Sequence, residues 1–345
     1  MDTSPGGPSR QPETHAGEPR RRRRRWPYVV GGLVALGLVG LAVIAVVLIA
    51  VASGGPTAPA LYEEEYVSGN GADKVAVVPI EGTIASADDT VGGVLPATTP
   101  EGLAGALDQA GSDPSVAAVV LEVNSPGGGV TASDEMHQSI LDFEKNTGKP
   151  VVVSMQDVAA SGGYYISAAA DRIVANETTL TGSLGVIFQI TNFAEAADKY
   201  GVKQVVIKSG KYKDIGNAFR EMTPEERDIF QSIVDESYAQ FVDVISEGRG
   251  IPEERVREIA DGRVYSGLQA ERLGLVDSFG GLDEASNIAG DLAGTSDTTV
   301  VRYVQQPTLT DTLLASFAPE KPQAEQILDA AGLTLEPKPY YLYRP

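Results

Sequence analysis

The stretch VAAVVLEVNSPGGG, residues 116–129, carries the clearest indication of the fold. It begins as a short apolar run, typical of a buried strand, and ends in a turn that contains a proline and three glycines. Similar runs at Val75–Ile80, Val151–Met155, Arg172–Ala175 and Val205–Lys208 alternate with segments of helical periodicity. This alternation predicts an α/β domain with a largely parallel sheet and helices on both faces.

Helix starts in this domain are marked by capping signals. Thr131 with Asp134 predicts a helix directly after the glycine-rich turn. The segment Thr223–Glu226 combines a cap, a proline at the first helical position and a capping-box glutamate, and it predicts a long helix up to Gly248. Because ligands gather at the carboxyl ends of parallel strands, the glycine-rich turn and the turn at Ser161 are expected to face one cleft.

The composition limits the possible chemistry. The chain has no cysteine, which excludes disulfides, thiolate nucleophiles and cysteine-ligated metals. Its two histidines are His15, in a basic leader, and His137, so a catalytic histidine would have to be His137. The net charge is −20 although residues 1–25 carry a net +4, and so acidic a domain is not expected to bind nucleic acid.

One segment is long and apolar enough to cross a membrane. Val29–Ala52 has 24 residues without a charged side chain, preceded by the basic run Arg20–Arg25 and by Trp26 and Tyr28 at interface depth. The positive-inside rule predicts a cytoplasmic N-terminus and a catalytic domain outside the cytoplasmic membrane. A cleaved signal peptide, with Ala50–Ala52 as the cleavage site, is the alternative, and it exports the domain as well.

The sequence therefore divides into five segments. We expect a disordered basic leader at 1–25, a transmembrane helix at 26–52, a linker at 53–73, the α/β domain at 74–294 and a C-terminal tail at 295–345.

The first stretch that could carry chemistry is the glycine-rich turn, residues 124–129. Three glycines after a strand let backbone N–H groups approach a ligand closely, and such donors can hold a phosphate or the oxyanion of acyl transfer. No Gly-Lys-Ser/Thr follows, so the turn is not a P-loop. An ordinary tight turn is the simpler interpretation.

Two further stretches contain a possible nucleophile and a possible base. Ser161, among small residues at a strand-to-helix turn, is either an exposed nucleophile or an N-cap. Lys208, Lys211 and Lys213 follow a strand, and most lysine clusters are solvated faces. A serine hydrolase without a usable histidine needs another base, and a desolvated lysine can serve. The local sequence does not choose among the three lysines.

Four segments in order resemble peptidase family S49, the bacterial signal peptide peptidases. They are Val123–Gly129, Ala160–Tyr165, Thr181–Val186 and Lys208–Asp214, and the similarity extends over residues 74–292. The chain corresponds to the short form of the family, with one copy of the domain. The resemblance implies a ClpP/crotonase-like fold.

The resemblance also implies roles for individual residues. Ser161 would be the nucleophile and Lys213 the general base of a Ser-Lys dyad. Gly128 and Gly162 would supply the oxyanion-hole N–H groups, and Ser183 would orient Lys213. No cofactor or metal is implied, and the expected substrates are remnant signal peptides and other apolar peptides.

Short forms of the family assemble as rings, so we expect a homo-oligomer with the helix at Thr223–Gly248 partly at the subunit contact. One chain contains both Ser161 and Lys213 and could hold a complete dyad. The acid-free tail, Pro339–Pro345, is expected to dock on a neighbouring acidic domain near its active site. The rival functions are a crotonase-like acyl-CoA enzyme and a non-catalytic membrane scaffold. The acidic domain and the presence of both dyad residues disfavour them.

Overall fold

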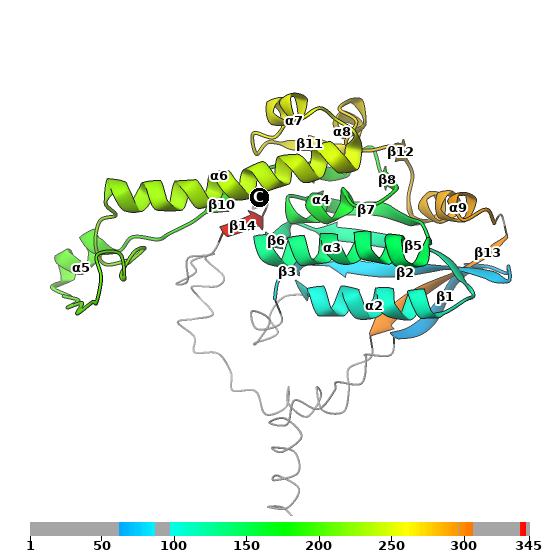
Figure 1. The fold of residues 1–345 in the computed structure, drawn as a ribbon, viewed down its shortest axis with the longest axis horizontal. Coiled ribbons are helices and arrows are strands. Elements are labelled where there is room, and N and C mark those ends of the chain that lie inside the picture. The colour runs from blue at the N-terminus through cyan, green and yellow to red at the C-terminus, as the bar shows by residue number, and fades with distance from the viewer. Residues whose placement is uncertain (1–61, 87–96, 296, 306–338, 343–345) are drawn as a thin grey trace, which may run out of the picture. The chain divides into compact units, whose positions relative to one another are not determined.

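A computed structural model describes residues 62–86, 97–295, 297–305 and 339–342 (Figure 1). All of them belong to a compact unit that begins at Ala58. The leader and the membrane span predicted from the sequence lie outside the described residues. Within those residues, no helix has the length and apolar character needed to cross a membrane.

Nine strands of the described chain form the main sheet, in the order β1-β13-β2-β5-β7-β8-β12, with β9 beside β7 and β11 beside β9. Pairing is parallel from β13 through β12, whereas β1 is antiparallel to β13 and β11 to β9. The largely parallel sheet predicted from the apolar runs is therefore confirmed. The strands are β1 (Tyr62–Gly69), β2 (Asp73–Glu81), β5 (Val116–Ser125), β7 (Val151–Ala160), β8 (Arg172–Ala175), β9 (Leu180–Gly182), β11 (Val264–Ser266), β12 (Ser278–Phe279) and β13 (Thr298–Gln305).

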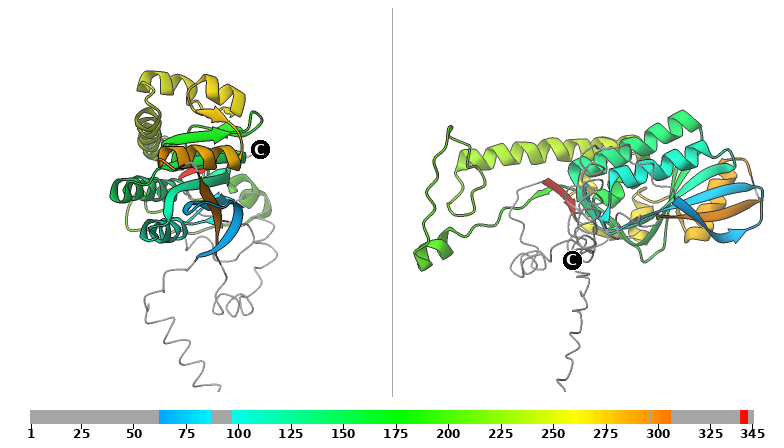
Figure 2. Two further views of the ribbon diagram at one scale, coloured as in Figure 1. Left: turned by 90° about the vertical axis from the view of Figure 1, so that its right-hand side faces the viewer. Right: turned by 90° about the horizontal axis from the view of Figure 1, so that it is seen from below.

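Helices cover both faces of this sheet, as the sequence predicts (Figures 1 and 2). Successive residues of β2 point to opposite sides: Ala76 and Val78 enter the larger core, and Val75 and Val77 the smaller one. The smaller core is closed by α9 (Leu282–Leu292). The larger core is closed by α2 (Pro100–Ser112), α3 (Val130–Thr147), α4 (Gly162–Ser167), α6 (Pro224–Arg249), α7 (Glu253–Ile259) and α8 (Gly267–Arg272).

Two strands of the main sheet lie in segments predicted as linker and tail. The expected linker at 53–73 contains β1, and the expected tail at 295–345 contains β13, which pairs with β2. β1 was missed because its centre is Glu63–Glu65, exposed on an edge strand, so no apolar run marks it. The folded domain is therefore larger than the predicted 74–294.

A second, smaller sheet lies beside the glycine-rich turn. Its order is β10-β14-β6-β3-β4, formed by β10 (Ile187–Phe188), β14 (Pro339–Leu342), β6 (Gly127–Gly129), β3 (Thr83–Ile84) and β4 (Ala97–Thr98). The C-terminal strand β14 is antiparallel to both of its neighbours, β10 and β6. The end of the chain thus returns to the turn that the sequence analysis singled out.

Residues 189–223 form an arm between β10 and α6, which contains α5 (Ala194–Tyr200) and extends away from the main sheet (Figures 1 and 2). The strand predicted at Val205–Lys208 is absent: this segment lies in the arm without regular structure. Val205 and Ile207 are 85% and 98% exposed. Their β-branched side chains favour a strand, but no neighbouring strand pairs with them there.

The two predicted capping boxes have different outcomes. At α6 the Thr223 side chain accepts from the Glu226 backbone and the Glu226 side chain accepts from Thr223, as predicted. The box at Thr131 and Asp134 is wrong: α3 begins after Gly129 without a side-chain cap. Asp134 instead accepts a hydrogen bond from the Tyr165 hydroxyl at 2.8 Å, which ties α3 to α4.

Candidate active site

Ser161 stands at a strained turn between β7 and α4. Its backbone has φ 54° and ψ −115°, and the other non-glycine residue with positive φ in the described chain is Ser183, at φ 51°. Such conformations cost of order 1–3 kcal/mol and cluster at functional sites. The two turns are linked, because the Ser161 N–H donates to the Gly182 carbonyl at 2.8 Å. For these two serines the family resemblance implies the role of nucleophile at Ser161 and of orienting the lysine at Ser183.

The Ser161 side chain is buried but makes no hydrogen bond in the described chain. The residue is 1% exposed, and its Oγ has no hydrogen-bond partner among the residues that the structure describes. Leaving a buried hydroxyl unpaired costs stability, which is unusual in a structural serine. A hydroxyl held in this way remains available for chemistry.

The glycine-rich turn lies against the start of α4. A side chain on Gly162 would place its Cβ 3.0 Å from the Gly128 nitrogen, and one on Gly128 would place its Cβ 1.8 Å from the Ile84 carbonyl oxygen. Both positions therefore require glycine, because the backbones pack too closely for a Cβ. The turn is further fixed by the Ser125 hydroxyl, which accepts from the Gly127 N–H at 3.1 Å. The Gly128 and Gly162 backbones thus lie next to Ser161, where an oxyanion hole is predicted.

Lys213, the predicted base, is not brought to Ser161 within the described chain. It is exposed on the arm, and its backbone N–H donates to the Gly210 carbonyl at 3.2 Å. Ser183, expected to orient the lysine, is half-buried beside the nucleophile turn, and its N–H donates to the Arg263 carbonyl at 2.7 Å. Within the described chain, Ser161, Gly128, Gly162 and Ser183 therefore lie close together, whereas Lys213 lies on the arm and not beside them.

The arm around Lys213 is fixed by ion pairs. Arg220 donates to the Asp214 carboxylate from Nε and Nη2, each at 3.1 Å, and to the Asp214 carbonyl at 2.9 Å. Lys208 Nζ donates to the same carboxylate at 2.5 Å, and Arg220 also pairs with Glu226 at the start of α6. The sequence analysis did not identify this cluster. Arg220 is six residues from Asp214 and six from Glu226. This spacing only weakly indicates an ion-pair cluster, because it corresponds to no regular contact within a helix or strand.

These ion pairs keep the acids of the arm charged. Hydrogen bonds from Arg220, and then from Lys208, hold the pKa of Asp214 well below its usual range. Arg220 and the Thr223 backbone lower the pKa of Glu226 to about 2. The cluster is therefore ionised throughout the neutral and mildly acidic range.

His137 packs in the core between α3 and α4. It is buried, and its ring meets the Tyr165 ring edge-on at a centroid distance of 5.3 Å. Burial lowers its pKa, against a smaller opposing effect of Asp134. It makes no hydrogen bond to Ser161, whose Oγ is unpartnered in the described chain. His137 is therefore a packing residue between the two helices.

β14 places an extended peptide against the glycine-rich turn. Tyr340, Tyr341 and Leu342 pair with Gly129, Gly128 and Gly127 in antiparallel register. On its other side, Tyr340 pairs with Ile187 and Pro339 with Phe188. The tail was expected on a neighbouring molecule, but here it docks within its own chain. The space between β6 and β10 thus accepts a peptide backbone as an added strand.

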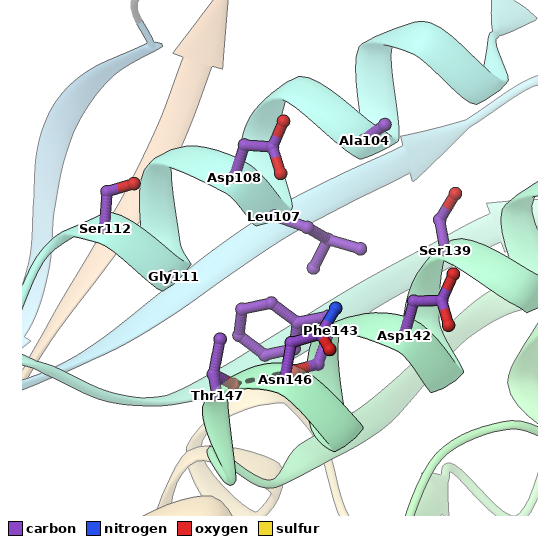
Figure 3. A pocket seen from close by; sticks show the side chains of 10 residues that line it. All are labelled: Ala104, Leu107, Asp108, Gly111, Ser112, Ser139, Asp142, Phe143, Asn146 and Thr147. Atoms are coloured by element: carbon purple, nitrogen blue, oxygen red, sulfur yellow. Dashed lines mark hydrogen bonds between the residues drawn. The ribbon is translucent and has the colours of Figure 1, made fainter.

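A hollow of about 440 Å³ lies elsewhere, between α2 and α3 (Figure 3). Its lining includes Leu107, Asp108, Asp142 and Phe143 but no predicted site residue. Over the described residues, no cluster of three or more His, Asp or Glu side chains could hold a metal ion. The strained serine turn, not this hollow, is therefore the candidate active site.

Comparisons with known proteins place the chain among peptidases. The family model "Peptidase family S49" matches residues 144–296. A Methanocaldococcus jannaschii protein provisionally named a protease is 41% identical over 197 residues, 57% of this chain and 63% of that relative. An Enterococcus faecium protein provisionally named signal peptide peptidase SppA is 35% identical over 67% of this chain and 70% of its own length. Protease 4 of Haemophilus influenzae is 35% identical over 76% of this chain, which corresponds to 42% of the relative.

Proposed function

We propose that this chain, which belongs to peptidase family S49, is a serine endopeptidase with Ser161 as nucleophile and Lys213 as general base. The observation that carries the proposal is the Ser161 turn. Its hydroxyl is unpartnered in the described chain, its backbone is strained, and the Gly128 backbone lies beside it. A nucleophile next to backbone N–H groups is the arrangement that acyl transfer needs.

The reaction begins when neutral Lys213 takes the Ser161 proton as Oγ attacks the scissile carbonyl. The carbonyl oxygen becomes an oxyanion and accepts hydrogen bonds from the N–H groups of Gly128 and Gly162. Lys213 then gives the proton to the leaving amine. Water hydrolyses the acyl-enzyme and restores Ser161, and Ser183 keeps the lysine oriented throughout.

We infer that the dyad is completed between two copies of the chain, within a homo-oligomeric ring. The arm carries Lys213 away from the body in which Ser161 sits, and its apolar Val205 and Ile207 are almost fully exposed. On the outer half of α6, Ile229 and Ile233 are 36% and 38% exposed. A second copy is the partner that would cover these side chains and receive the arm.

Mixing two inactive variants tests this assembly. Ser161→Ala and Lys213→Ala chains, dissociated together and reassembled, should regain part of the activity, because some contacts then combine an intact serine with an intact lysine. If the mixture stays inactive while wild-type chains recover under the same treatment, the dyad forms within one chain.

The proposed substrates are extended apolar peptides, in particular signal peptides released from preproteins. The support is the pairing of β14 between β6 and β10, which gives a peptide backbone partners on both edges. The name of the Enterococcus faecium relative points to the same substrate class.

The proposed location is the outer side of the cytoplasmic membrane, with Val29–Ala52 as the anchor and the N-terminus in the cytoplasm. A reporter that fluoresces only in the cytoplasm, fused after Pro345, should stay dark. A bright fusion would reverse the orientation.

Labelling the detergent-solubilised full chain with a fluorophosphonate tests the central claim. The adduct should be found on Ser161 by peptide mass spectrometry and should be lost in Ser161→Ala. An adduct on another serine, or peptide cleavage by the Ser161→Ala variant, would reject Ser161 as the nucleophile.

A further inference from the structure

Ser133, in the first turn of α3, is a buried hydroxyl without a structural task. It is 0% exposed, and its Oγ has no hydrogen-bond partner in the part of the chain that the structure describes. Serine hydroxyls inside helices usually donate to the carbonyl one turn earlier, as Ser139 does to Glu135 at 2.8 Å in the same helix. Ser133 does not, so its donor is free.

The free hydroxyl points toward the candidate oxyanion hole. A Cβ built on Gly162 would lie 2.5 Å from Ser133 Oγ and 3.0 Å from the Gly128 nitrogen. The hydroxyl and the Gly128 nitrogen therefore approach Gly162 from the same side. This approach is possible because residue 162 has no side chain, and Ser161 is the preceding residue.

We propose that Ser133 is a third hydrogen-bond donor of the oxyanion hole, in addition to the N–H groups of Gly128 and Gly162. The inference rests on the proposed function, since it needs a tetrahedral intermediate on Ser161. As the Ser161 Oγ–carbon bond forms, the π electrons of the scissile carbonyl move onto its oxygen. Ser133 donates a hydrogen bond to that oxygen and keeps its own proton, so it neither gains nor loses an atom in the reaction.

The unpaired state of Ser133 fits this role. A donor that is fixed by the fold and desolvated before the reaction needs no reorganisation when negative charge develops. Its cost appears in the resting protein, where a buried hydroxyl without a partner destabilises the fold. A hydroxyl that served only packing would be replaced by alanine without loss of function.

The Ser133→Ala variant separates the two roles. Removing one oxyanion-hole donor typically lowers kcat by about 10²–10³-fold. We expect such a loss in kcat with little change in KM, and a parallel loss in affinity for a peptide aldehyde, whose adduct with Ser161 carries the oxyanion. The melting temperature should not fall, because no partner is left unpaired.

Ser286→Ala is the matched control. Ser286 lies on α9 at the other face of the sheet and is also buried, at 3% exposure, with an unpartnered Oγ in the described chain. It should keep wild-type kcat and aldehyde affinity. If Ser133→Ala behaves in the same way, the third donor is rejected. If Ser133→Ala loses kcat only together with thermal stability, the hydroxyl has a structural role. Activity in Ser161→Ala would instead overturn the proposed function.

Discussion

The body and the arm supply the two halves of the proposed dyad by different physical means. Around Ser161, position is set by packing: the residue is buried, its φ is positive, and glycines allow backbones to approach without side chains between them. Lys213 itself is exposed, and the position of the arm around it is set by the charges of Arg220 and of the more buried Asp214 and Glu226. In the proposed dyad, the nucleophile is therefore held in position within one chain. The base would reach a nucleophile only through contact with a second copy of the chain.

The two halves should therefore respond differently to salt and to substitution. Packing in the body is insensitive to salt and depends on side-chain volume. In the ion pairs around the arm, the cations Lys208 and Arg220 are about one-third exposed, whereas the carboxylates of Asp214 and Glu226 are mostly buried. Salt partly screens such pairs, so the arm depends on several pairs acting together. Most of the following variants change one half and leave the other intact.

The largest effect is expected from removing either dyad residue. Ser161→Ala and Lys213→Ala should each lower kcat by about 10⁴–10⁶-fold, and the double variant should be little worse, because the two act as a unit. Lys213→Arg should also be inactive, since a guanidinium stays protonated and cannot act as the base. Peptide cleavage by the solubilised full chain measures all four.

Lys211→Ala is the control on the same arm. Lys211 is exposed and its ammonium lies over the Tyr212 ring at 4.8 Å, outside the ion-pair cluster apart from its backbone carbonyl. It should retain activity. Equal loss in Lys211→Ala and Lys213→Ala would mean that the arm needs positive charge and not one specific base.

A smaller loss is expected when the arm is loosened without removing Lys213. Arg220→Gln breaks the contacts with both Asp214 and Glu226, so Lys213 is no longer held in one place. Misplacement by about 1 Å can cost about 10²-fold, so we expect a 10–100-fold lower kcat. Arg220→Lys should restore little of the lost activity, because lysine lacks the planar guanidinium whose several N–H groups bind both carboxylates.

For this variant, Arg255→Gln is the control, since Arg255 pairs with Glu258 on the exposed surface of α7. Fluorophosphonate labelling of Ser161 in Arg220→Gln should reach the same end point as in the wild type, only more slowly. An unchanged kcat in Arg220→Gln would show that the cluster does not position the lysine.

The same contrast explains what could be predicted from the sequence. The strands β2, β5, β7 and β8 are buried on both faces and therefore read as apolar runs. The edge strand β1 was missed because it is rich in glutamate. β13 was missed because it lies beyond residue 294, where the sequence analysis ended the domain. Val205–Lys208 was predicted as a strand from its residue types, but the arm offers it no pairing partner. Ser161 and Gly128 were identified from their motifs, whereas the strain at Ser161 and the free hydroxyl of Ser133 depend on tertiary contacts that the local sequence does not encode.

The pH dependence of stability should come from the body and not from the acids around the arm. Burial, and then repulsion by Asp171, raises the pKa of Glu144 on α3 from 4.5 to about 8. The folded state therefore binds more protons than the unfolded chain between about pH 4.5 and pH 8, and stability falls as pH rises through this window. Glu226, at the start of α6 next to the arm, has its pKa lowered to about 2 and stays charged throughout.

Glu144→Gln tests whether titration of Glu144 lowers stability as pH rises. At pH 8.5 the variant should melt a few degrees above the wild type, at about 2–4 °C for each kcal/mol recovered. Near pH 4.5 the two melting temperatures should be similar, because the wild-type carboxyl is then largely protonated. The same difference at both pH values would exclude titration of Glu144 as the cause.

The smallest effect concerns β14, which belongs to neither half but lies on the body beside Gly128. If the tail occupies the place of a substrate strand, the fraction of open sites is reduced and the apparent KM rises by that factor. Deleting residues 339–345 should therefore raise kcat/KM by about 2–10-fold through KM, with kcat unchanged. Tyr341 pairs with Gly128 of β6, and a proline there would have no backbone N–H to offer a neighbouring strand, so Tyr341→Pro should weaken β14 and give part of the same gain. A synthetic peptide of the tail sequence should then inhibit the truncated enzyme competitively. If truncation instead lowers kcat, β14 is a structural part of the site, and the glycine-rich turn needs it in order to hold its shape.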